Sequence, residues 1–202
     1  MINRGTKPRW AVIAVSVCLL GGIFFGVFSD FWSGDLDKEN PISIGGEFTL
    51  MSDTGPVSLS SYAGQVVLIF FGYTYCPDVC PIELARMSSA FRELSLEEAS
   101  QTRGLFITID PERDTIKRVS DYAGFFHDNI VGLTGKPEEI SEVAKKFSVV
   151  YQKSNDDDVS HYVVDHSTTT YLIGRDGLVS NLLRPSLTSI EVAEAIQVAL
   201  KN

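Results

Sequence analysis

Two cysteines that could carry chemistry stand between an apolar run and a predicted helix. Cys76 and Cys80 are four residues apart, so a helical first turn would place both sulfurs on one side. The N-terminus of the following helix offers unpaired N–H groups and the positive end of its dipole, which favour thiolate over thiol. Pro81 suits the first helical position, where a missing N–H costs nothing. Such a pair can bind a soft metal or cycle between dithiol and disulfide. A purely structural disulfide is disfavoured because so short a ring stabilises little.

The chain has three histidines that could join the cysteines. His166 lies on a predicted connection between two strands, and by itself such a histidine is more often a packed or surface residue than a ligand. His161, beside the acidic residues 156–158, is the weaker alternative ligand. We expect His161 and His127 to be solvated.

The N-terminal segment is predicted to be a membrane anchor. Residues 10–28 are nineteen residues without a charge, enough to cross a bilayer core of ~30 Å at ~1.5 Å per residue. Arg4, Lys7 and Arg9 precede them and mostly acidic residues follow. The positive-inside rule therefore predicts a cytoplasmic tail over residues 1–9, with the rest exported, as on the periplasmic side of a bacterial inner membrane. The alternative is a cleaved signal peptide, which we disfavour because no small-residue cleavage site ends the run.

The charge balance limits the partners. The chain has 17 basic and 26 acidic residues, a formal net charge of −9, and three of the basic residues precede the predicted anchor. The exported part is therefore more acidic still, which argues against nucleic acid or an anionic membrane surface as partner. Because Cys18 falls in the predicted anchor, the exported part holds only the pair described above and is not a disulfide scaffold.

The exported part divides into a tether, residues 29–44, and one domain, residues 45–202. We expect strands over residues 47–51, 57–59, 65–71, 105–109, 130–133, 159–164, 169–173 and 178–183. We expect helices over residues 82–96, 115–126, 138–147 and 188–200. This order predicts an α/β fold with a mixed sheet covered on both faces by helices. In such sheets a site forms beyond a strand's carboxyl end, at the next helix's N-terminus, where the cysteines lie.

The chain resembles the Sco/SenC family of copper-binding assembly proteins for cytochrome c oxidase. Three motifs, in matching order and spacing, carry the resemblance over residues 42–202: Cys76-Pro77-Asp78-Val79-Cys80-Pro81, Asp110-Pro111-Glu112-Arg113-Asp114-Thr115 and Asp165-His166-Ser167. The resemblance implies a thioredoxin-like fold. It also implies that Cys76, Cys80 and His166 are the ligands of copper.

The implied ligand set makes chemical sense. Two thiolates and an imidazole form a soft, low-coordinate set that suits Cu(I), and with Cu(II) the same set is formally neutral. Zinc would also accept these ligands and ranks below copper because of the family resemblance. Oxidation of the cysteines to a disulfide would remove two ligands at once, so the thiol redox state would control metal loading.

Acidic residues near the motifs could tune the site. Asp110 is the best candidate to orient a ligand, whereas Asp78 could modify the field at the cysteines and Asp165 could orient the histidine. Simple capping or turn formation is the competing explanation for all three. We also expect an ion pair between Arg113 and Asp114 that fixes the loop.

The resemblance implies a membrane-anchored metallochaperone that delivers copper to the dinuclear copper centre of cytochrome c oxidase, or prepares its cysteines. The implied partners are the copper-bearing oxidase subunit, a copper donor and a thiol reductant on the same side of the membrane. The alternatives are a thiol-disulfide oxidoreductase, which would be an enzyme, or a copper or redox sensor. Two features weaken the oxidoreductase hypothesis. Thr168 stands at the position where thioredoxin-like reductases carry proline, and three residues separate the two cysteines. Ile69 and Tyr73 replace the Pro and Thr of a peroxiredoxin motif, which disfavours a peroxidase.

Overall fold

The computed structural model describes residues 44–154 and 164–202. The predicted tail and anchor lie outside the described residues, together with His161, nearly all of the tether and most of the strand expected over residues 159–164. Within the described ranges, none of the helices has the length and apolar character needed to cross a bilayer. Residues 44–202 form one compact unit with its own hydrophobic core.

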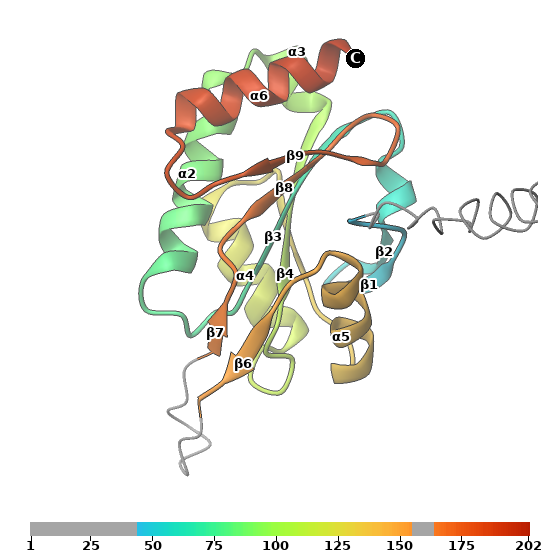
Figure 1. The fold of residues 1–202 in the computed structure, drawn as a ribbon, viewed down its shortest axis with the longest axis vertical. Helices are drawn as coiled ribbons and strands as arrows, with labels where there is room; N and C mark the ends of the chain where they lie inside the picture. Colours follow the sequence, from blue (N-terminus) through green and yellow to red (C-terminus); the bar gives the residue numbers. More distant parts are fainter. Residues whose placement is uncertain (1–43, 155–163) are drawn as a thin grey trace, which may run out of the picture. The chain divides into compact units, whose positions relative to one another are not determined.

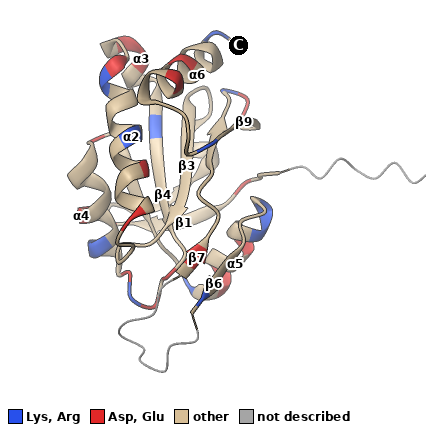
Figure 2. Ribbon diagram, turned by 60° about the vertical axis from the view of Figure 1, so that its left-hand side comes forward, with Lys and Arg blue, Asp and Glu red and all other residues tan. Residues whose placement is uncertain are grey.

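A five-stranded mixed sheet in the order β5-β4-β3-β8-β9 forms the centre of this unit (Figure 1). Its strands are β3 Val66–Gly72, β4 Thr102–Thr108, β5 Ile130–Leu133, β8 Thr170–Ile173 and β9 Val179–Leu183. β3, β4 and β5 are parallel, whereas β8 runs antiparallel to both β3 and β9. Every residue of β3 is buried, as expected for an apolar run covered on both faces. Figure 2 shows that charged residues are nearly absent from β3 and β4 and occur on the helices and the connecting loops.

Helices cover both faces of the sheet, as the sequence predicts. One face carries α2 Val79–Glu93, α4 Ile116–Phe126 and α6 Ser189–Lys201, and the other carries α5 Pro137–Lys146 and the hairpin of β1 Thr49–Ser52 and β2 Gly55–Ser58 (Figure 1). Adjacent β3 residues point to opposite faces. The Phe70 ring stacks on Phe106 with centroids 6.3 Å apart, whereas the Phe71 ring lies 5.5 Å from Phe147.

Several boundaries differ from the sequence prediction. Helix α2 begins at Val79, three residues before the predicted start, so Pro81 is its third residue; this is still within the first turn, where N–H groups have no intrahelical partner. The strand expected over residues 57–59 ends at Ser58, and Leu59–Tyr62 form a 3-10 helix.

The predicted capping box of the last helix is confirmed, since Thr188 accepts a hydrogen bond from the backbone N–H of Glu191.

Two short elements were not predicted. Helix α3, Leu96–Ser100, begins at a capping box formed by Ser95 and Glu98, a pattern that is visible in the sequence. Strand β6, Tyr151–Lys153, pairs antiparallel with β7, Val164–His166. His166 therefore ends a strand and does not lie on a connection.

Candidate metal centre

The cysteines lie where β3 gives way to α2. Cys76 is in the connecting loop, where its N–H donates to the carbonyl oxygen of Tyr73 at 3.2 Å. Cys80 is in the first turn of α2, and its N–H points at the Cys76 sulfur, with N and Sγ 3.5 Å apart. Both are buried free thiols. The two sulfurs lie close together at the start of the helix, although Cys76 is in the loop before α2 and not in its first turn as the spacing suggested.

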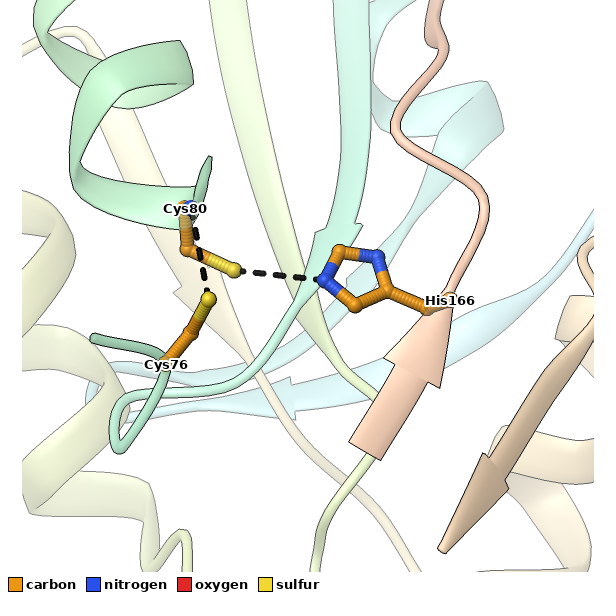
Figure 3. A group of neighbouring side chains, drawn as sticks. All are labelled: Cys76, Cys80 and His166. Carbon is orange, nitrogen blue, oxygen red and sulfur yellow. Dashed lines mark hydrogen bonds between the residues drawn. The ribbon is translucent and has the colours of Figure 1, made fainter. Parts of the chain in front are cut away.

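Strand β7, which pairs with β6 outside the central sheet, brings His166 to the same place from 86 residues further along the chain. Its Nε2 atom lies 3.5 Å from Cys80 Sγ, and the two sulfurs and one ring nitrogen all lie within 4.8 Å of one another. Figure 3 shows the sulfurs and the imidazole edge turned toward each other. The ring packs edge-on against Phe70 and Tyr73, with centroids 6.1 and 5.9 Å away.

The tautomer of His166 follows from its other ring nitrogen. Nδ1 lies 2.9 Å from the carbonyl oxygen of Ser167, and a carbonyl can only accept a hydrogen bond. Nδ1 therefore carries the proton and donates it, which leaves the lone pair of Nε2 directed toward the sulfurs. A backbone carbonyl on the second ring nitrogen is the usual way in which a metal-binding histidine is oriented.

The two thiols are electrostatically unequal. The Cys80 thiol donates a hydrogen bond to the Cys76 sulfur, and this bond, against the effect of burial, lowers the pKa of Cys76 to about 4. The same bond, together with burial, raises the pKa of Cys80. Cys76 is therefore the more acidic thiol of the pair.

Gly72, the last residue of β3, leaves space for the Cys80 sulfur. A Cβ atom at this position would lie 2.7 Å from Cys80 Sγ and 2.9 Å from a ring carbon of Phe106. Both neighbours are fully buried, so neither can move without disturbing the close-packed side chains around it. No local sequence pattern marks this glycine as part of the site.

The three acidic residues singled out from the sequence lie in different environments. Asp110 is fully buried and its carboxylate accepts from Arg113 Nε at 2.5 Å, while the Arg113 guanidinium lies over the Tyr75 ring, 4.9 Å from its centroid. Asp78 is exposed at the N-cap position of α2 and its side chain makes no capping hydrogen bond. Asp165 is exposed, and as the neighbour of His166 in β7 its side chain points away from the ring.

The expected ion pair between Arg113 and Asp114 is wrong. Arg113 pairs with Asp110, and Asp114 is instead buried against the cysteine loop. Its carboxylate accepts from the backbone N–H and the hydroxyl of Thr74 and from the hydroxyl of Thr108. These contacts could not be predicted from the sequence because Thr74 is 40 residues away and no local pattern marks the pairing.

The donor atoms fit a soft metal ion. Two sulfurs and an imidazole nitrogen with its lone pair available converge at the N-terminal end of a helix, where both cysteines are buried and the histidine is half-buried. Thiolate and imidazole ligands favour copper or zinc over hard ions such as magnesium. Among the described residues, no other group of His, Cys, Asp and Glu side chains converges in this way.

Comparison with known proteins supports this assignment. The family model described as SCO1/SenC matches residues 37–201. The chain belongs to the SCO1/SenC family. Protein SCO2 homolog, mitochondrial, of Bos taurus is 32% identical over 200 residues, which cover 96% of this chain and 75% of that protein. Protein SCO1 homolog 1, mitochondrial, of Arabidopsis thaliana is 40% identical over 141 residues, which cover 67% of this chain and 42% of that longer protein.

The solved structure of Bradyrhizobium japonicum ScoI with copper bound superposes with a TM-score of 0.72 at 36% identity, covering 78% of this chain and 99% of that chain. The domain therefore has the thioredoxin-like fold that the resemblance implied. The Sco family is one of cytochrome c oxidase assembly proteins.

Proposed function

We propose that this chain is a membrane-anchored copper-binding protein that delivers copper to the dinuclear copper centre of cytochrome c oxidase, or prepares its cysteines. In this proposal Cys76, Cys80 and His166 are the copper ligands. The observation that carries it is the convergence of two sulfurs and an Nε2 lone pair within 4.8 Å. The copper-bound ScoI structure, which shares the family and the fold, supports copper as the metal.

The site is suited to carry copper in both oxidation states. Cu(I) with two thiolates has a formal charge of −1, which the positive end of α2 stabilises. Cu(II) with the same ligands is formally neutral, so a largely buried site can hold it without a large solvation penalty. The His166 ring is held by Ser167 and by two aromatic rings, so little side-chain freedom is lost when the site is filled.

The proposal also places the domain outside the cytoplasm. With residues 10–28 as a retained anchor, the domain faces an oxidising compartment, in which Cys76 and Cys80 drift toward the disulfide. A disulfide leaves neither thiolate available to the metal. Copper loading therefore needs a thiol reductant and a copper donor on the same side of the membrane.

A second candidate function is thiol-disulfide exchange with the oxidase cysteines. The lowered pKa of Cys76 favours it, because a thiolate is the attacking species. Cys76 would attack a target disulfide, and Cys80 would then resolve the mixed disulfide. The target gains two electrons and the pair becomes a disulfide.

A strain that lacks this chain distinguishes the two functions. Copper delivery predicts that the oxidase loses copper and that added copper restores at least part of it. Complementation with His166→Ala should then fail, because this variant keeps the thiols and loses a ligand. If a membrane-permeant thiol reductant restores the oxidase and added copper does not, exchange is the function and His166 is not essential.

A further inference from the structure

The Asp114 carboxylate is a buried charged group that the proposed copper chemistry does not use. It is fully buried in the loop after β4. Its Oδ2 atom accepts from the Thr74 backbone N–H at 2.9 Å and from Thr108 Oγ1 at 2.6 Å, while Oδ1 accepts from Thr74 Oγ1 at 2.5 Å. A buried carboxylate with three donors is costly to assemble, and its loss would leave those donors without an acceptor.

These bonds fix the loop that carries Cys76. Thr74 lies two residues before Cys76, within the turn that Cys76 closes by donating its N–H to Tyr73. Thr108 is the last residue of β4, which pairs with Gly72 at the end of β3. One carboxylate thus joins the carboxyl end of β4 to the start of the cysteine loop.

Asp114 is itself held firmly. Its N–H donates to the carbonyl oxygen of Asp110 at 3.0 Å, and its carbonyl oxygen accepts from the Thr134 hydroxyl at 3.3 Å. Its neighbour Arg113 lies over the rings of Tyr73 and Tyr75, which flank Thr74 in the cysteine loop. The turn of residues 110–114 therefore braces the loop at two adjacent points.

We infer that Asp114 is a positioning residue, which acts through Thr74 to hold the cysteine loop in the geometry that brings the Cys76 sulfur to Cys80 and His166. The charge of Asp114 and its hydrogen bonds have opposite effects on metal binding. A carboxylate near two thiolates repels them and would weaken a site that carries a formal charge of −1. The carboxylate is therefore useful to the site only through the positions that its hydrogen bonds impose.

Three substitutions in the full chain separate geometry from charge. Asp114→Asn removes the charge and keeps the shape, because its carbonyl can accept from the Thr74 N–H and its amide can donate to a threonine hydroxyl. Asp114→Ala removes the carboxylate that accepts all three hydrogen bonds. Thr74→Val removes only the hydrogen bond of the Thr74 hydroxyl, with little change of shape. The matched control is Asp121→Ala, which deletes an exposed carboxylate in α4 that pairs with exposed Lys117.

The first measurements are the Cu(I) affinity by anaerobic competition and the Cu(II)–thiolate absorption band. Asp114→Ala should bind Cu(I) about 10–100-fold more weakly and show an altered band, as other supports of metal ligands do. Asp114→Asn should recover most of the affinity, Thr74→Val should fall between, and the control should match the wild type. Tighter binding by both Asp114 variants would show that charge dominates and would overturn the inference.

A second readout needs no copper and so separates this inference from the proposed function on which the first arm rests. Diamide takes two electrons and two protons from the cysteine pair of the metal-free chain and leaves a disulfide. Asp114→Ala should close the disulfide more slowly than the wild type and Asp114→Asn should not. If Asp114→Ala does not fold, Thr74→Val decides, and a wild-type closure rate in that variant overturns the inference. A wild-type chain that binds no copper would contradict the proposed function and leave this second test valid.

Discussion

Replacing Gly72 with alanine should displace the Cys80 sulfur and weaken metal binding. The added Cβ would lie 2.7 Å from Cys80 Sγ, roughly 0.7 Å inside the shortest ordinary contact of 3.4 Å. Phe106 and Phe70 ring carbons would lie 2.9 and 3.1 Å away, so the clash cannot be relieved by moving one flexible chain end. Ligand distances at a metal site hold to about ±0.2 Å, so a sulfur displaced by this amount no longer fits the site.

The expected result of Gly72→Ala is a folded chain with much weaker copper binding. Overpacking should lower the free energy of unfolding by about 1–3 kcal/mol, and the midpoint of thermal unfolding by about 2–4 °C for each kcal/mol. Thermal unfolding of the metal-free chain and anaerobic Cu(I) competition measure the two effects. The matched control is Gly124→Ala in α4, where a Cβ meets no atom within 4 Å and should stabilise by about 0.5–1 kcal/mol. Wild-type copper affinity and wild-type stability in Gly72→Ala would refute the packing argument.

Two further predictions concern the ligands and the thiols. His166→Ala should abolish the Cu(II)–thiolate absorption and keep weaker Cu(I) binding, because two thiolates alone hold Cu(I). The control, His161→Ala, should leave the spectrum unchanged. A larger loss of absorption in His161→Ala than in His166→Ala would contradict the ligand assignment. The rate of Cys76 alkylation by iodoacetamide in the metal-free chain should be nearly constant between about pH 6 and 8 and fall toward pH 4, because the pKa of this thiol is lowered to about 4 and the thiolate is the reacting form. A rate that rises tenfold per pH unit over that range would show an ordinary thiol, and Cys80→Ser, which keeps a donor beside Cys76, should preserve the flat profile.

The sequence predicted the elements whose signals are local. The apolar run of β3 and the cysteine pair before α2 fall together on the chain, so both the buried strand and the site at its carboxyl end could be predicted. Helix α3 was missed although its capping box, Ser95 to Glu98, is a recognisable local pattern. Strand β6 is only three residues long and has no buried residue, and it exists because it pairs with β7.

The supports of the site could not be predicted because they depend on distant pairings. His166 was weak as a ligand on local grounds; the motif resemblance singled it out, and the pairing of β7 with β6 holds it in place. Asp114 next to Arg113 looked like an ion pair, yet the turn after β4 directs Arg113 to Asp110 and Asp114 to Thr74. The space required at Gly72 arises only when β3 packs against the start of α2.

The most direct test of the account is an anaerobic copper titration of the full chain, first with the cysteines reduced and then with the disulfide formed. The copper-loaded chain is then mixed with the copper-binding domain of the oxidase, from which the metal has been removed. The account predicts one copper per reduced chain, none per oxidised chain after gel filtration, and movement of the metal to the oxidase domain. Equal copper content in the two redox states would contradict the assignment of Cys76 and Cys80 as ligands. Copper that stays on the chain while the oxidase cysteines become reduced would contradict delivery and favour thiol exchange.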